Sequence, residues 1–154
     1  MARCAVSLLA KSVSVDPFSN ALAVIDIAEN LVVVAPEVPN ASEETPHIVS
    51  PFSWVFVVLL ARSDPNSPEE LKMRLTIVSP NGREFPGTEQ RVDLATAGFA
   101  RTFIVIPGMP YTGNGVYRFR VETAFESEWR PIAESQVPLS ISTQDPHQAP
   151  PPNP

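Results

Sequence analysis

The feature that most constrains the fold of this chain is residues 115–123, where apolar and charged side chains alternate. Side chains along a β-strand point to opposite faces of the sheet with a period of two. The stretch therefore predicts a strand with one face in a core and the other in water. The core face comprises Tyr117, Phe119, Val121 and Thr123, and the solvent face comprises Arg118, Arg120 and Glu122. We expect Phe119 to be buried most completely.

Similar patterns recur along the chain and predict seven to nine strands. Besides residues 115–123, the candidate strands are residues 4–15, 21–34, 53–61, 71–77, 83–85, 88–94, 99–106 and 129–142. Residues 53–61 are apolar on both faces, which predicts a strand covered on both sides. Residues 21–34 also fit a buried helix, but their many β-branched residues favour a strand.

Two of the predicted strands carry further expectations. In the first, one face comprises Cys4, Val6, Leu8 and Ala10. This strand is favoured over a cleaved signal peptide, because no clear small-residue cleavage site follows the short apolar run. In the last, Pro131 and Pro138 indicate a position at the edge of a sheet, since proline cannot donate to a ladder.

Turn-forming residues separate the predicted strands, as is typical of an antiparallel β-sandwich. Residues 79–82 (SPNG) suit a tight hairpin turn. A small closed β-barrel has the same alternation and is the alternative fold. We expect one domain over residues 1–142, loops at 35–51 and 107–115, and a proline-rich disordered tail at 143–154.

Composition argues against several kinds of partner. The formal net charge is −6, and the eleven Lys and Arg residues are scattered, so neither nucleic acid nor an anionic membrane surface is expected. No run of about 18 apolar residues predicts a transmembrane helix. Cys4 is the single cysteine, and the lack of a disulfide framework favours a cytoplasmic location. With only His47 and His147 beside it, no zinc site and no cofactor are predicted.

The residues typical of enzymes are not arranged for catalysis. His47 lies in the proline-rich loop and His147 in the tail, and neither place is expected to hold a histidine rigidly. Cys4 is predicted to be a small buried hydrophobe. The neighbouring acids are interpreted as solvated charge: Glu43 with Glu44, Glu69 with Glu70, and Glu126 with Glu128. We predict a protein without enzymatic activity and assign no catalytic residue.

Three further groups of residues are weighed as binding sites. Four aspartates are candidates for calcium, although turn initiation explains them as well: Asp16, Asp26, Asp64 and Asp93. Four aromatic residues are candidates for a carbohydrate platform, although the core is the commoner place for them: Trp54, Tyr111, Phe125 and Trp129. A basic strip of Arg74, Arg118 and Arg120 is weighed against cross-strand pairing with Glu84, Glu89 or Glu122.

Several segments resemble known sandwiches. This chain resembles immunoglobulin-like domains in its turn SPNG (79–82), its strand GVYRFRV (115–121) and its final strand VPLSI (137–141). The opening VSVD (13–16) and LAV (22–24) resemble an uncharacterised family of small bacterial domains of unknown function. The resemblance extends over most of residues 4–142, but it rests on turns and core positions. It implies a fold and no functional residue, and the Cys-Trp-Cys arrangement usual in immunoglobulin domains is absent.

An interaction surface is the function that these observations leave. Residues 31–34 are entirely apolar and lie beside the proline-rich loop, and such an edge either pairs with another chain or must be covered. We therefore predict a bacterial, cytoplasmic protein-interaction or assembly module that binds a protein partner or forms a homo-oligomer. A sandwich that binds calcium or carbohydrate is the alternative.

Overall fold

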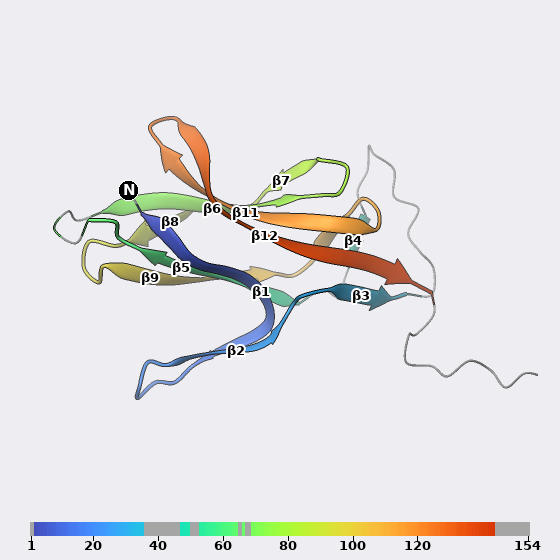
Figure 1. Ribbon diagram of the computed structural model, residues 1–154, viewed down its shortest axis with the longest axis horizontal. Coiled ribbons are helices and arrows are strands. Elements are labelled where there is room, and N and C mark those ends of the chain that lie inside the picture. The colour runs from blue at the N-terminus through green and yellow to red at the C-terminus, as the bar shows by residue number, and fades with distance from the viewer. Residues whose placement is uncertain (1, 36–46, 50–52, 65, 67–68, 144–154) are drawn as a thin grey trace, which may run out of the picture.

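A computed structural model describes residues 2–35, 47–49, 53–64, 66 and 69–143 (Figure 1). The described residues form these strands: β1 (Arg3–Val15), β2 (Leu22–Ile27), β3 (Leu31–Val34), β4 (His47–Val49), β5 (Trp54–Ala61), β6 (Glu70–Val78), β7 (Glu84–Pro86), β8 (Gln90–Asp93), β9 (Phe99–Ile106), β10 (Met109–Tyr111), β11 (Gly115–Phe125) and β12 (Glu128–Ser142). Among the described residues there is no helix of the length and apolar character needed to cross a membrane. The predicted tail beyond residue 143 lies outside the described residues.

Two sheets face one another as in a β-sandwich (Figure 1). Sheet A has the strand order β2-β1-β5-β9, and sheet B has the order β3-β12-β11-β6-β7, with β8 also paired to β6. A separate ribbon joins β10 to β4. The ladders are antiparallel except for the parallel pair β12–β3. Among the described strands neither sheet closes on itself. The prediction of an all-β fold is therefore confirmed, and the alternative of a closed barrel is not what these strands form.

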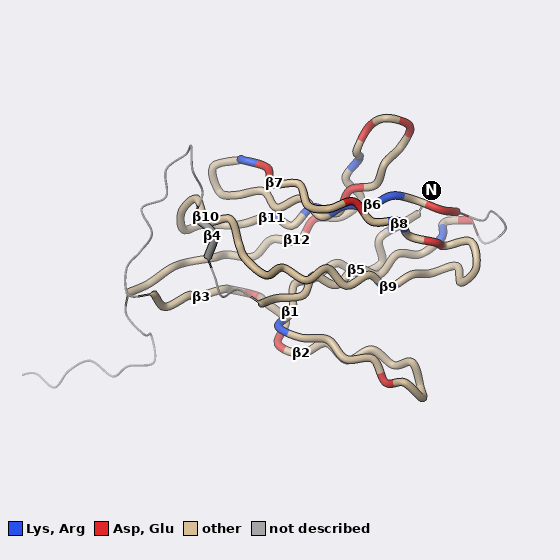
Figure 2. Tube along the Cα trace, turned by 180° about the vertical axis from the view of Figure 1, so that it is seen from behind, with Lys and Arg blue, Asp and Glu red and all other residues tan. Residues whose placement is uncertain are grey.

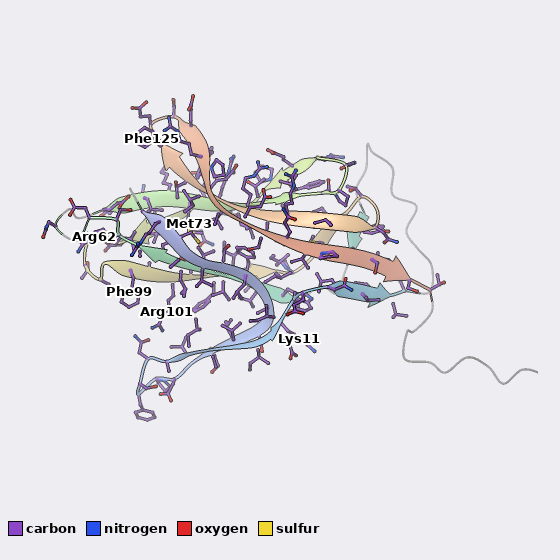
Figure 3. All side chains as sticks on the ribbon, in the orientation of Figure 1. Lys11, Arg62, Met73, Phe99, Arg101 and Phe125 are labelled. Carbon is purple, nitrogen blue, oxygen red and sulfur yellow. The ribbon has the colours of Figure 1, made fainter. Side chains whose placement is uncertain are left out.

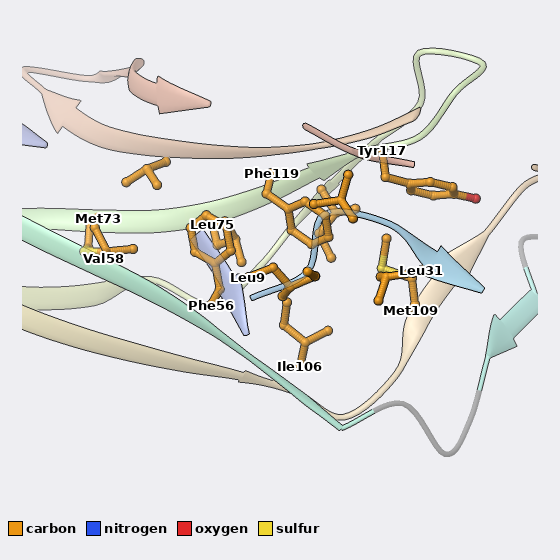
Figure 4. Packing of buried hydrophobic residues seen from close by; sticks show 14 of the residues in the cluster. Leu9, Leu31, Phe56, Val58, Met73, Leu75, Ile106, Met109, Tyr117 and Phe119 are labelled. Carbon is orange, nitrogen blue, oxygen red and sulfur yellow. The ribbon is translucent and has the colours of Figure 1, made fainter. Parts of the chain in front are cut away.

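The core lies between the inner faces of the two sheets (Figure 4). Phe56 of β5 and Phe119 of β11 stack there, with ring centroids 5.6 Å apart and planes inclined by 14°. Both side chains are fully buried, as are Tyr117 and Val121. The strict alternation in residues 115–123 therefore assigned the core face of β11 correctly.

The strand predicted at residues 53–61 to be covered on both sides lies inside a sheet in the structure. β5 lies between β1 and β9 in sheet A. Phe56, Val57 and Val58 follow one another along β5 and all are fully buried. Because successive side chains point to opposite faces, this burial means that β5 is covered on both sides.

β1 does not keep the predicted faces. Its ladder with β5 shifts register between Cys4 and Val6. Beyond the shift, Leu9 belongs to the core, whereas Val6 is exposed. The prediction of one shared face through Cys4, Val6, Leu8 and Ala10 is wrong, because an irregularity of this kind reverses the alternation along the rest of the strand.

Residues 21–34 form two strands that belong to different sheets. β2 ends at Ile27, and β3 begins at Leu31 as the edge strand of sheet B. Between them, the N–H of Ala28 donates to the carbonyl oxygen of Leu9 at 2.8 Å. The strand assignment is confirmed over most of the run, but three residues carry the chain from one sheet to the other.

Two predicted loops contain short strands. Residues 47–49 of the first loop form β4, and residues 109–111 of the second form β10. The two strands pair in register, with Met109 opposite Val49 and Tyr111 opposite His47. Strands of three residues leave too short a pattern for alternation to reveal them. Residues 36–46, 50 and 51 of the first loop lie outside the described residues.

The prediction that β12 lies at the edge of a sheet, which was based on its prolines, is wrong. β12 pairs with β11 on one side and with β3 on the other, so it is not an edge strand. The ladder with β3 involves only residues 139–142. Pro131 and Pro138 lie before that ladder begins, where the missing N–H costs no bond to β3.

The hairpin turn predicted at residues 79–82 is confirmed. The N–H of Gly82 donates to the carbonyl oxygen of Ser79 at 2.9 Å, and the N–H of Ser79 donates to that of Arg83 at 2.9 Å. Gly82 has a φ of +85°, which glycine adopts without steric cost. The turn joins β6 to β7 and brings Pro80 close to the first residue of β11.

We expect Gly115→Ala to lower the free energy of unfolding by about 1–3 kcal/mol. Gly115 has a φ of +149°, and an added Cβ would lie 2.8 Å from Cβ of Pro80. Gly113 provides the matched control, because its φ is +141° but an added Cβ would have open space. Urea unfolding of both variants separates the two costs. An equal loss in both would mean that contact with Pro80 does not matter.

Candidate interaction surface

β1 changes partner along its length and so creates an arm. Its first part pairs with β5 and its last part, from Ala10 to Val15, pairs with β2. We call residues 11–26 the arm, which comprises the end of β1, most of β2 and the turn between them. Figure 1 shows this two-stranded arm turning away below sheet A, on the side opposite sheet B.

The turn of the arm is ordered by local hydrogen bonds. Oδ1 of Asp16 accepts from the N–H groups of Phe18 at 2.7 Å and Ser19 at 2.9 Å. These bonds hold the pKa of Asp16 below its usual value. Arg101 of β9 donates through Nη1 to the carbonyl oxygen of Asn20 at 2.8 Å and to its Oδ1 at 3.1 Å (Figure 3). The arm is thus bonded to the far strand of sheet A.

Apolar side chains remain exposed along the arm and on the strand that follows it. Phe18 at the turn is 98% exposed. In β2, Ile25 and Ile27 are 48% and 55% exposed, and in β3, Val32 and Val34 are 46% and 50% exposed. We call these last four residues the β2–β3 edge surface. Leu31 and Val33, which alternate with the two valines, face the core instead.

The two strands that carry this surface are both edge strands. Among the strands that the structure describes, β2 pairs only with β1, and β3 pairs only with β12. Natural edge strands are usually protected by lysine, proline or a bulge, because unpaired backbone groups recruit other chains. β7, at the other edge of sheet B, is only three residues long and contains Pro86. β2 and β3 contain neither lysine nor proline. Asp26 is their single charged residue, and its φ of +52° leaves residues 22–25 as the regular part of β2.

The arginines weighed as a basic strip do lie near one another on the outer face of sheet B, because β6 and β11 are neighbours. Nε of Arg74 donates to Oε2 of Glu122 at 2.7 Å, and the hydroxyl of Thr76 donates to the same oxygen at 2.7 Å. The Arg74 guanidinium also stacks over the ring of Trp129, 4.4 Å from its centroid. Burial alone would raise the pKa of Glu122, but these hydrogen bonds and the arginine charges lower it.

The remaining charges of this face also occur in cross-strand pairs. Nη1 of Arg120 lies 2.7 Å from Oε1 of Glu84, and its Nε lies 3.4 Å from Oε2 of Glu134. Arg118 lies 4.0 Å from the same oxygen of Glu134. Figure 2 shows acidic and basic residues interspersed over sheet B. The arrangement matches the expected cross-strand pairing, and the strip offers no excess of positive charge to a ligand.

Three of the four candidate calcium ligands serve turns. Asp16 holds the arm turn, Oδ1 of Asp64 accepts from the N–H of Asn66 at 2.9 Å, and Oδ1 of Asp93 accepts from the N–H of Ala95 at 2.7 Å. Asp26 is exposed in β2. In the part of the chain that the structure describes, no three His, Cys, Asp or Glu residues gather as metal ligands.

The four candidate aromatic residues do not form a common platform. Tyr111 is buried, and its hydroxyl donates to Oδ1 of Asn114 at 2.8 Å. Trp54 packs against the core at the start of β5. Phe125 and Trp129 lie in the hairpin between β11 and β12, but Phe125 stacks with Arg130 and Trp129 with Arg74.

The structure also shows where two of the residues considered for catalysis lie. Cys4 is half-buried against the core, where burial raises the pKa of its thiol, so it fits the predicted role of a small hydrophobe. His47 lies in β4, and His147, Glu43 and Glu44 lie outside the described residues.

Cavities do not change this picture. A cavity of about 580 Å³ beside β6 and β8 is lined by charges of both signs, including Lys72 and Asp93. Asp93 already caps a turn, and Lys72 lies 3.9 Å from Glu89. A smaller cavity of about 290 Å³ opens between the sheets and is largely apolar, with Ile77 and Ile104 in its lining.

No family model matches the chain, and no curated protein matches it significantly. The edge strands β2 and β3, with their exposed apolar side chains, are therefore the feature that bears on function.

Proposed function

We propose that this chain is a non-enzymatic protein-interaction or assembly module that binds through the β2–β3 edge surface. The single observation that carries the proposal is the exposure of four β-branched side chains on two unprotected edge strands: Ile25, Ile27, Val32 and Val34. Strand addition at such an edge supplies main-chain hydrogen bonds for affinity, and side chains on alternate positions supply specificity. A bacterial, cytoplasmic setting remains part of this proposal.

The proposed module is an immunoglobulin-like sandwich, and two observations support this. In sheet B, β12, β11 and β6 lie in the order of strands G, F and C, and in sheet A, β1, β5 and β9 fit strands A, B and E. The hydroxyl of Tyr117 in β11 donates to the carbonyl oxygen of Gly113 at 3.1 Å and accepts from the N–H of Thr112 at 2.9 Å. A tyrosine near the start of strand F bonds back to the preceding backbone in the same way in such domains.

No observation favours calcium or carbohydrate binding over assembly. Three of the aspartates are engaged in turns and Asp26 is exposed in β2, and the aromatic side chains are dispersed between the core and one hairpin. Immunoglobulin-like sandwiches serve many unrelated functions, so the fold does not choose among them. The exposed edge does, because an unprotected apolar edge is a hazard in a chain without a partner.

The proposal is tested by the size of the complex that contains the chain in extracts of its source cells. We expect the tagged chain to sediment well above the mass of a monomer. The double variant Ile27→Lys with Val32→Lys should sediment as a monomer, because buried lysines would be charged and unpaired. Val116→Lys is the matched control, since Val116 is 45% exposed on sheet B. A wild-type chain that sediments as a monomer in extract would refute the proposal.

A further inference from the structure

The backbone of β2 is prepared to accept a further strand. The N–H of Asp16 donates to the carbonyl oxygen of Ala21 at 2.9 Å, so these residues form a hydrogen-bonded pair of a ladder that is regular up to Ile25, before Asp26 with its φ of +52°. In an antiparallel ladder such pairs alternate with non-bonded pairs. The register Val13–Val24 and Val15–Leu22 therefore belongs to the non-bonded set. Leu22 and Val24 accordingly direct their N–H and C=O groups away from β1.

The surroundings of this edge restrict its occupant. Ile25 and Ile27 remain about half exposed beside it, so a partner strand must bring apolar side chains. Residues 12–25 contain one charged residue, Asp16, and the charges of sheet B lie on the far side of the molecule (Figure 2). The occupant must also be extended and must offer its own free donors and acceptors.

We propose that the occupant is β2 of a second copy of this chain, paired antiparallel to form one continuous sheet from two copies of sheet A. β2 meets each requirement, because it is an apolar edge strand with outward donors and acceptors. A twofold axis makes such an interface self-complementary, as in most homodimers. The inference rests on the proposed function and names the partner for β2.

The charges of β2 are compatible with this pairing. In a symmetric antiparallel pair the outward-facing residues of the two copies lie opposite one another, so Val24 lies opposite Val24 of the other copy, and Asp26 lies opposite Leu22. The single acid of the strand therefore does not meet its own copy, which would repel it. Within each chain the register with β1 runs without a gap from Ser12–Ile25 to Val15–Leu22, and Asp26 beyond it has a φ of +52°.

Sedimentation velocity of the purified full-length chain over a wide range of concentrations tests the inference. We expect a reversible monomer–dimer equilibrium that is unchanged or strengthened by added NaCl, because each copy carries a net charge of −6. Val24→Pro should weaken the dimer roughly tenfold to a hundredfold, since it removes an outward donor from each copy. A proline whose N–H position faces away from the ladder is tolerated in an edge strand.

Ile25→Lys supports the same conclusion without altering the backbone, and we expect it to weaken the dimer by about tenfold or more. Val116→Lys is the control and should leave the equilibrium unchanged. If Val24→Pro lowers the melting temperature, Ile25→Lys decides the outcome. A dimer that survives both β2 substitutions would overturn the inference, because another surface would then join the copies.

The failures of the two proposals are distinguishable. A purified chain that stays monomeric at every concentration overturns pairing through a second β2. If the same chain still sediments in a large complex in extract, and the β2–β3 edge variant does not, the assembly function stands with a different partner. Association that weakens steeply with NaCl contradicts a pairing of two acidic copies through an apolar edge.

Discussion

Replacing Phe119 with alanine is expected to lower the free energy of unfolding by about 3–5 kcal/mol. The ring is fully buried in the centre of the core and stacks on Phe56 with centroids 5.6 Å apart. Truncation removes the transfer free energy of the side chain, and rigid strands on both sides prevent the cavity from collapsing. Chemical denaturation at equilibrium measures the loss.

Val116→Ala, in the same strand, is the matched control for this experiment. Val116 is partly exposed on the opposite face of β11, so its truncation should cost well under 1 kcal/mol, as surface substitutions usually do. A loss below about 1 kcal/mol for Phe119→Ala would contradict the assignment of the core face. Equal losses in the two variants would lead to the same conclusion.

Glu122→Gln is expected to destabilise the protein by about 2–3 kcal/mol at neutral pH. Glu122 is buried on the outer face of sheet B, and its Oε2 accepts from Arg74 and Thr76, both at 2.7 Å. Hydrogen bonds to a charged acceptor are stronger than neutral ones. The neutral amide keeps the shape of the side chain but leaves the guanidinium of Arg74 without its buried counter-charge.

The effect of Glu122→Gln should depend on pH in a defined direction. Because the folded protein holds the pKa of Glu122 below its usual value, the ionised carboxylate stabilises the fold above that usual value. This contribution is lost as the pH falls through the pKa of the folded state. Urea titrations at pH 7 and pH 3 should therefore show a large difference between wild type and variant at pH 7 and a smaller one at pH 3.

Glu84→Gln is the control for the pH experiment. Glu84 binds Arg120 at 2.7 Å on the same face, but its side chain is about half exposed. Exposed ion pairs contribute about 0–1 kcal/mol, so the substitution should have little effect at either pH. A Glu122→Gln difference that is the same at pH 7 and pH 3 would show that the charge of Glu122 does not stabilise the fold.

Local pattern was enough to identify the long strands and their faces where alternation was unbroken. β11 is the clearest case, because between Tyr117 and Thr123 the charged residues lie on one face and the uncharged residues on the other. The same reasoning failed in β1, where an irregularity between Cys4 and Val6 shifts the register. Such a shift leaves composition and spacing unchanged, so only the partner strand reveals it.

The candidate surface was predicted only in part. The apolar run of residues 31–34 was identified as an edge, and β3 is an edge strand. Ile25, Ile27 and Phe18 were not singled out, because an apolar strand looks the same in sequence whether one of its faces is covered or not. The contact of Asn20 with Arg101 joins residues 81 positions apart, and no local pattern reports a contact of that separation.

The sequence by itself determined the class of fold and much of its core. A period of two in apolar residues is a local property of the chain, and burial of one face follows from it. The tertiary structure alone decided which strands remain without a partner. Pairing depends on contacts between distant segments, so the division of residues 21–34 between two sheets appears only when β1 and β12 are in place. Residues 115–123 thus organise the core, whereas the proposed function lies on strands whose exposure the folded chain decides.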